Sequence, residues 1–154
     1  MLYGMNKSKI NTKAEIHGNI NIEEGSPINI PLYLSPVEAG FPSPAEDYVE
    51  KSLNLHDYIV KHKSATYFVR AHGMSMINAG IHDGDLLVVY RALSAENKRI
   101  VIAAIDGELT VKRLVRRAKK VFLVPENPDF PEIDITHREY VHIWGVVTYA
   151  IHQL

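Results

Sequence analysis

The chain has 154 residues, of which 46% are hydrophobic, so it is long enough to bury one ordinary core. Its formal net charge of -1 at pH 7 lacks the basic excess that sequence-independent binding to nucleic-acid phosphates requires. It contains no cysteine, which excludes disulfides, thiol nucleophiles and zinc–thiolate sites. No stretch approaches the roughly 20 apolar residues of a membrane span. We therefore expect a cytoplasmic protein without membrane contact or direct specific DNA binding.

The N-terminal part of the chain is polar and rich in asparagine up to about residue 38. It lacks sustained helical or strand periodicity, so we interpret it as a flexible N-terminal arm. Residues 43–46, Ser-Pro-Ala-Glu, then combine a capping serine, proline at the first helical position and a glutamate three residues after the cap. This combination predicts a short helix that begins at Pro44.

From Thr66 onward the pattern is that of β structure. Short runs rich in β-branched and aromatic residues cover residues 66–71, 86–90, 100–105, 108–114, 121–124 and 140–151. Turn signals rich in Gly, Pro, Asp and Asn separate these runs. The predicted fold class is therefore mainly β, as a single compact domain of mostly antiparallel strands with a short helix.

The sharpest local signal is Asp106-Gly107. Two-residue hairpin turns need positive φ angles, which favour Asp-Gly. The dipeptide predicts a hairpin between residues 100–105 and 108–114, and this hairpin places Lys112 on a strand.

Ser75 is the candidate nucleophile. It lies in His72-Gly73-Met74-Ser75-Met76, directly after a predicted strand, where a glycine allows a sharp turn. Such a turn presents a hydroxyl and neighbouring backbone N–H groups at the end of a sheet, as a nucleophile with an oxyanion hole requires. The alternative is that Ser75 only caps a short helix.

Lys112 is the candidate base, provided that burial keeps its amine neutral near pH 7. The two-residue period of a strand places Thr110, Lys112 and Leu114 on one face, so the amine has an apolar neighbour and a hydroxyl nearby. The alternative is that Lys112 belongs to a solvated charged face. The neighbouring charged residues are Arg113, Arg116, Arg117, Lys119 and Lys120.

Histidine offers the rival base, because His72 precedes Ser75 by three residues. Its position before Gly73 directs the side chain away from the Ser75 hydroxyl. His137 and His142 are five residues apart, which suits neither a helix face nor a strand face. We predict neither a Ser/His pair nor a metal site.

These residues resemble the LexA/UmuD family of self-cleaving proteins, in particular its UmuD-like members. The resemblance covers about residues 32–150. Its motifs are residues 39–44, 64–68, 73–76, 83–86 and 110–114, in the order and spacing of the family.

The resemblance implies a role for each matching residue. Ser75 is the nucleophile, Lys112 the general base, and the backbone N–H groups of Met74 and Ser75 hold the oxyanion. The scissile bond lies between Ala39 and Gly40. Residues 1–39 are then the arm removed by self-cleavage, and residues 40–154 are the Ser/Lys peptidase domain.

The resemblance also implies partners. It predicts a homodimer, cleavage stimulated by a RecA filament on single-stranded DNA, and a product that serves as accessory subunit of a UmuC-type translesion DNA polymerase in SOS mutagenesis. It implies no cofactor. The basic residues 116–120 contact either an acidic partner or phosphates, or form a solvated hairpin tip.

Three other functions fit parts of this pattern. A catalytically silent module with the same fold would bind a polymerase without cutting itself. A LexA-like repressor fragment would need a helix-turn-helix, for which residues 1–38 show no helical periodicity. A Ser/Lys signal peptidase would need a membrane anchor.

Overall fold

The computed structural model describes residues 15–16, 30–33, 39–40 and 49–154. The segment 62–154 forms one compact unit together with residues 15–16, and the described residues between 30 and 61 form another. The predicted helix at Pro44 lies outside the described residues. The predicted division at residue 39 concerns cleavage and stays a prediction. Among the described helices, none is long and apolar enough to cross a membrane.

The smaller unit contains a strand pair and a short helix. Strand β2 (Ile30–Tyr33) pairs antiparallel with β3 (Val49–Leu53). Helix α1 (Leu55–Ile59) follows, and the side-chain oxygen of Asn54 caps it by accepting hydrogen bonds from the backbone N–H groups of His56 and Asp57. In the same unit, Ala39 and Gly40 form an exposed bend.

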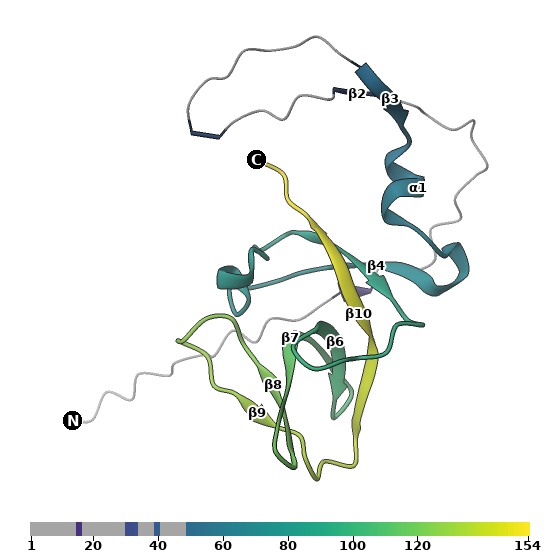
Figure 1. The fold of residues 1–154 in the computed structure, drawn as a ribbon. Coiled ribbons are helices and arrows are strands. Elements are labelled where there is room, and N and C mark those ends of the chain that lie inside the picture. The colour runs from purple at the N-terminus through teal and green to yellow at the C-terminus, as the bar shows by residue number, and fades with distance from the viewer. Residues whose placement is uncertain (1–14, 17–29, 34–38, 41–48) are drawn as a thin grey trace. The chain divides into compact units, whose positions relative to one another are not determined.

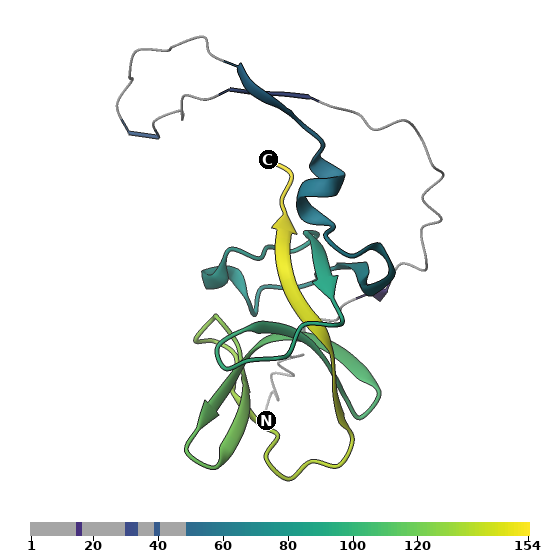
Figure 2. The same cartoon turned by 45° about the vertical axis from the view of Figure 1, so that its right-hand side comes forward.

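The larger unit is an antiparallel sheet with the strand order β1-β4-β5-β10-β6-β7-β8-β9 (Figures 1 and 2). Its strands are β1 (Glu15–Ile16), β4 (Thr66–Arg70), β5 (Leu86–Tyr90), β6 (Ile100–Ile105), β7 (Glu108–Arg117), β8 (Lys120–Val124), β9 (Ile133–Asp134) and β10 (Val141–Ile151). Two short 3-10 turns, η1 (Lys63–Ala65) and η2 (Ile77–Ala79), precede β4 and β5. The predicted mainly β, antiparallel fold class is confirmed.

The β6–β7 hairpin forms as predicted around Asp106-Gly107. Both residues have positive φ angles, 51° and 84°, which the two-residue turn requires. The turn fixes the register, so Ile105 pairs with Glu108 and Val101 pairs with Lys112. Lys112 therefore lies well inside the sheet and not at the exposed end of the hairpin.

Strand β10, yellow in Figures 1 and 2, runs between β5 and β6. Its register against β6 shifts just before Gly145, where an added Cβ would lie 2.7 Å from a side-chain atom of Val89. Glycine therefore permits the close approach of β10 to β5. Further along, Ile151 pairs with Leu86, so the C-terminal end of β10 meets the beginning of β5.

Apolar side chains cover both faces of the sheet. One buried cluster consists of Val69, Ala71, Met76, Ile81, Leu87, Val89, Ile102 and Val111. The other consists of Val101, Ala103, Leu114, Leu123 and Val146. Alternate residues of β6 enter different clusters, which is the two-residue period of a strand buried on both sides. The first cluster includes Met76, so it anchors the segment that carries Ser75.

The basic segment 116–120 forms the exposed tip of the β7–β8 hairpin. There, Arg117 donates hydrogen bonds of 2.9 Å to both carboxylate oxygens of Glu132.

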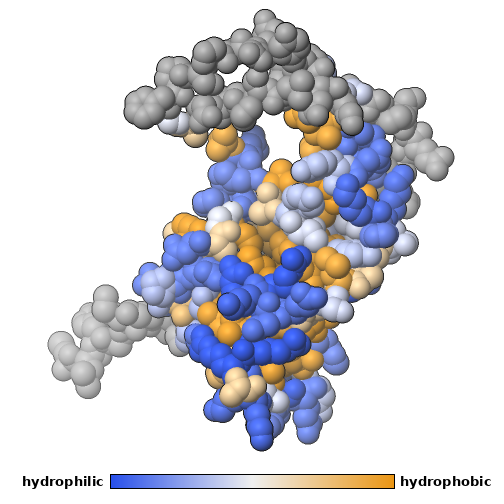
Figure 3. All heavy atoms as spheres, in the orientation of Figure 1, coloured by the Kyte–Doolittle hydropathy of each residue, from blue (hydrophilic) through white to orange (hydrophobic). Residues whose placement is uncertain are grey.

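Large apolar side chains also reach solvent. In the view of Figure 3, hydrophobic side chains are visible between hydrophilic ones. On β10 the exposed large hydrophobic residues are Ile143, Trp144, Tyr149 and Ile151.

Candidate active site

Ser75 lies in the tight segment that connects β4 to η2. Gly73 adopts a φ of 87°, which lets the chain turn directly after the strand. The backbone N–H of Gly73 donates a hydrogen bond to Asp83 at 2.6 Å, and the Asn127 amide donates one to the Met74 carbonyl at 2.9 Å. These bonds hold the Ser75 segment from two sides.

The structure brings Ser75 and Lys112 together. Ser75 is 0% exposed and Lys112 is 6% exposed. The Lys112 amine nitrogen lies 3.0 Å from the Ser75 hydroxyl oxygen, 2.9 Å from the Thr110 hydroxyl oxygen and 3.0 Å from the Val111 carbonyl oxygen. Both predicted chemical groups therefore meet at one buried point.

Burial lowers the pKa of the Lys112 amine from 10.5 to about 8, because the charged form loses its hydration. A neutral amine has two N–H donors and one lone pair. The hydroxyl of Thr110 and the carbonyl of Val111 can accept the two N–H bonds. The lone pair is then directed to the Ser75 hydroxyl, which is the arrangement of a general base beside a nucleophile.

The other predicted site residues occupy distinct places. The His72 side chain is 43% exposed, and its Nδ1 lies 3.5 Å from a carboxylate oxygen of Asp83. Met74 and Ser75 lie together in the turn, so their backbone N–H groups belong to the same short segment. Ala39 and Gly40 belong to the smaller unit.

Two residues that support the Ser75 segment are missing from the sequence prediction. Asp83 lies in one of the family motifs, residues 83–86, but is given no role there, and Asn127 lies among the turn residues between the predicted runs 121–124 and 140–151. Asn127 reaches Met74 across 53 residues of sequence, and the neighbouring Glu126 carbonyl accepts a hydrogen bond from the Asn78 N–H at 2.9 Å. Turn composition marks where such residues lie but not which distant backbone they contact.

Residues 31–148 match the family model of Peptidase S24-like proteins. The chain belongs to the peptidase S24-like family. This is a family of self-cleaving serine peptidases. The matched residues include Ser75 and Lys112 as well as Ala39 and Gly40, so the family assignment covers the whole candidate site.

Several curated relatives match most of the chain. Protein MucA of Salmonella typhimurium is 52% identical over 80% of this chain and 84% of its own length. Protein ImpA of Shigella flexneri is 49% identical over 80% of this chain and 83% of its own, and Protein SamA of Salmonella typhimurium is 46% identical over 80% and 85%. These relatives are UmuD-like SOS mutagenesis proteins. The resemblance predicted from the sequence is thereby confirmed.

Proposed function

We propose that this protein cleaves its own chain between Ala39 and Gly40, with Ser75 as the nucleophile and Lys112 as the general base. The observation that carries the proposal is the 3.0 Å approach of the Lys112 amine to the Ser75 hydroxyl, both in buried side chains. Membership in a family of self-cleaving serine peptidases supports the same assignment.

The first half of the reaction forms an ester. Neutral Lys112 accepts the proton of the Ser75 hydroxyl while Oγ attacks the carbonyl carbon of Ala39. The resulting oxyanion accepts hydrogen bonds from the backbone N–H groups of Met74 and Ser75. The Lys112 ammonium then donates its proton to the amide nitrogen of Gly40, the C–N bond breaks, and Ala39 stays bound to Ser75 as an ester.

The second half of the reaction releases the arm. Lys112, neutral again, accepts a proton from a water molecule that attacks the ester carbonyl. The new tetrahedral intermediate collapses, the proton returns to Ser75 Oγ, and residues 1–39 leave with a free carboxylate. Residues 40–154 remain as the product, and the dyad regains its starting state.

The residues at the cleavage site suit this reaction. Ala39 has a small side chain and Gly40 has none, so a strand that contains them can approach a buried serine closely. Both are exposed in the smaller unit and are thus accessible for docking. Because substrate and catalyst are parts of one protein, intramolecular delivery supplies a high effective concentration without strong binding.

We further propose that a RecA filament on single-stranded DNA stimulates the cleavage, by favouring the conformer in which the arm is docked. The 40–154 product then acts as accessory subunit of a UmuC-type translesion DNA polymerase, and the protein works as a homodimer. The likeness to UmuD-like SOS proteins supports this role. The exposed apolar side chains of β10 offer surface for a protein partner.

The decisive experiment incubates the purified full chain with and without a RecA filament, nucleotide and single-stranded DNA. The proposal predicts one new fragment whose N-terminal residue is Gly40, formed faster with the filament and not formed by the Ser75→Ala variant. A fragment with a different N-terminal residue would show that another peptide bond is cleaved. A wild-type chain that stays intact under all these conditions would instead indicate a silent interaction module.

A further inference from the structure

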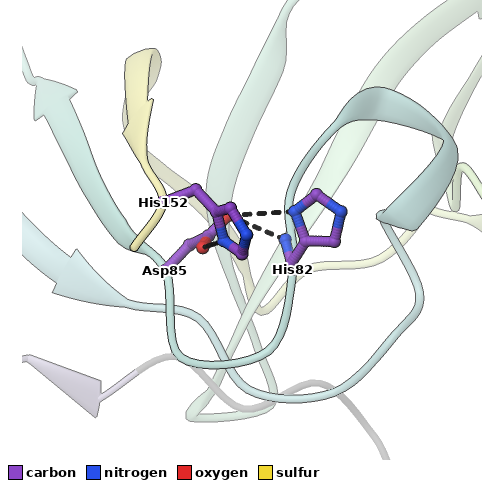
Figure 4. A group of neighbouring side chains, drawn as sticks. All are labelled: His82, Asp85 and His152. Carbon is purple, nitrogen blue, oxygen red and sulfur yellow. Dashed lines mark hydrogen bonds and ion pairs between the residues drawn. The ribbon is translucent and has the colours of Figure 1, made fainter. Parts of the chain in front are cut away.

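A second cluster of titratable side chains lies apart from the Ser75–Lys112 pair in the sequence. It consists of His82, Asp85 and His152 (Figure 4). His82 and Asp85 lie in the loop between η2 and β5, and His152 follows β10 directly. Because Ile151 pairs with Leu86 in antiparallel register, the residue that follows β10, His152, comes opposite Asp85.

The three side chains point toward one another in Figure 4. Nδ1 of His152 lies 2.7 Å from one carboxylate oxygen of Asp85, and Nδ1 of His82 lies 3.6 Å from the other. Each of the three residues offers one possible metal-ligand atom, and these three atoms all lie within 4.8 Å of one another. Two imidazole nitrogens and a carboxylate thus converge on one point.

The loop holds this arrangement before any ligand arrives. The backbone N–H of His82 donates to the Asp85 carboxylate at 2.8 Å, and the backbone N–H of Asp85 donates to the His82 carbonyl at 3.2 Å. Asp85 is 2% exposed, whereas the two histidine side chains are 43% and 41% exposed. A fixed carboxylate therefore lies beneath two rings that solvent can reach.

One polar atom of the cluster has an ion-pair contact but no hydrogen bond among the described residues. Nδ1 of His82 is shielded from solvent and makes no hydrogen bond with any residue that the structure describes. Shielded nitrogen atoms are normally hydrogen-bonded or bound to a metal. The atom faces the Asp85 carboxylate, so it is placed to contact an ion inside the cluster.

We propose that His82, Asp85 and His152 bind one divalent transition-metal ion, with Zn²⁺ as the best match. Zinc accepts imidazole and carboxylate ligands at about 2.0–2.2 Å in tetrahedral geometry, which separates neighbouring ligand atoms by about 3.3 Å. The His152 and His82 nitrogens lie 2.7 and 3.6 Å from different oxygens of the Asp85 carboxylate, and these distances lie on either side of this value. Mg²⁺ and Ca²⁺ prefer oxygen ligands, so two imidazoles disfavour them.

Three protein ligands leave one position of a tetrahedral ion for water. The bound ion would connect the end of β10 to the loop 82–85, whose Asp83 also accepts the hydrogen bond from Gly73 beside the Ser75 segment. The alternative is that the cluster binds no ion. The His152–Asp85 hydrogen bond alone would then join the end of β10 to the loop 82–85.

Calorimetric titration of the metal-free full chain with Zn²⁺ tests the proposal, with Mg²⁺ titrated in parallel. We expect one Zn²⁺ per chain and no comparable Mg²⁺ binding. His82→Ala and His152→Ala should each weaken Zn²⁺ binding by at least about tenfold, since even indirect contacts to a metal are worth about 10- to 100-fold. His142→Ala is the matched control, because His142 is an exposed histidine of β10 outside the cluster. It should bind Zn²⁺ like the wild type.

A thermal readout separates this site from adventitious binding to the chain's other histidines. Saturating Zn²⁺ should raise the Tm of the wild type and of His142→Ala, since a ligand that binds only the folded state stabilises it. It should not raise the Tm of His152→Ala, whose substitution lies at an exposed position after the last strand. A wild type without a stoichiometric Zn²⁺ site, or a His152→Ala variant that binds Zn²⁺ as tightly as the wild type, would overturn the proposal.

Discussion

The amine nitrogen of Lys112 lies 3.0 Å from the hydroxyl oxygen of Ser75, although 37 positions of sequence separate the two residues. Two local features produce this contact. The Asp106-Gly107 turn sets the register that buries Lys112 within the sheet, and the left-handed conformation of Gly73 turns the chain just before Ser75.

Replacing Lys112 with methionine keeps an unbranched side chain of similar size but removes the amine. The variant should cleave itself at least about a thousandfold more slowly, because members of a catalytic unit are individually indispensable. His72→Ala is the matched control and should cleave within about twofold of the wild type, since His72 lies beside Asp83. Gel densitometry over time measures both rates, and circular dichroism checks folding. If a folded His72→Ala variant were as inactive as Lys112→Met, the role of general base would belong to His72.

Thr110 is a positioning residue for Lys112, because its hydroxyl lies 2.9 Å from the amine. Thr110→Val keeps the shape but loses a hydrogen bond of about 0.5–1.5 kcal/mol, so cleavage should slow by roughly 2- to 10-fold. Thr110→Ser restores the hydroxyl and should restore the rate. Equal rates for the Val and Ser variants would show that the hydroxyl does not position the amine.

Gly40→Glu should block cleavage while leaving the fold intact. The added side chain and its charge have no place beside a buried serine and lysine, and an exposed glycine contributes nothing to the core. Mass spectrometry of the incubated variant should find only the full chain, with an unchanged Tm. Cleavage of Gly40→Glu at the wild-type rate would contradict docking of this bond at Ser75.

The sequence predicts the hairpin strands well because their turn has a strict conformational requirement. Residues 100–105 match β6, and β7 begins at Glu108 as predicted, since Asp106-Gly107 leaves little choice of turn. Strand β7 continues to Arg117, beyond the predicted end at residue 114, because it pairs with β8 as far as Lys120. The residues of this extension near the tip are charged, so a search for apolar and β-branched runs does not detect it.

Other features depend on contacts that a pattern does not encode. Strand β9 has only two residues, too few for a visible period, and α1 has five, with Asn54 as its main local signal. The placement of His152 opposite Asp85 follows from the β5–β10 register, which shifts once, between Val147 and Tyr149. The Ser75–Lys112 pair was predictable because a family resemblance joined two motifs that individually are weak.

Stability should also depend on the protonation of Lys112. Between pH 8 and 10.5 the unfolded chain retains the Lys112 proton while the folded protein has lost it, so the free energy of unfolding rises with pH in this window. The full rise is about 3 kcal/mol, from a pKa difference of roughly 2.5 units. Below pH 8 both states are protonated and the cost of burying the charge is complete.

Urea unfolding of uncleavable protein measures this effect. The Ser75→Ala variant should gain about 3 kcal/mol more between pH 8 and 10.5 than the Ser75→Ala, Lys112→Met double variant, since other titrating groups cancel in the comparison. Parallel curves for the two proteins would show that Lys112 has the same pKa in the folded and unfolded states.

The most direct test of the account is the rate of self-cleavage without RecA from pH 6 to 10.5, on protein that circular dichroism shows to be folded. If neutral Lys112 is the base, the rate should rise about tenfold per pH unit at low pH and become constant above about pH 8, where burial has placed the pKa. A histidine base would already give a constant rate near neutrality, because unperturbed histidine titrates near ~6.5. A rate that is constant from pH 7 upward would therefore contradict Lys112 as the base, and one that rises up to pH 10 would contradict its lowered pKa.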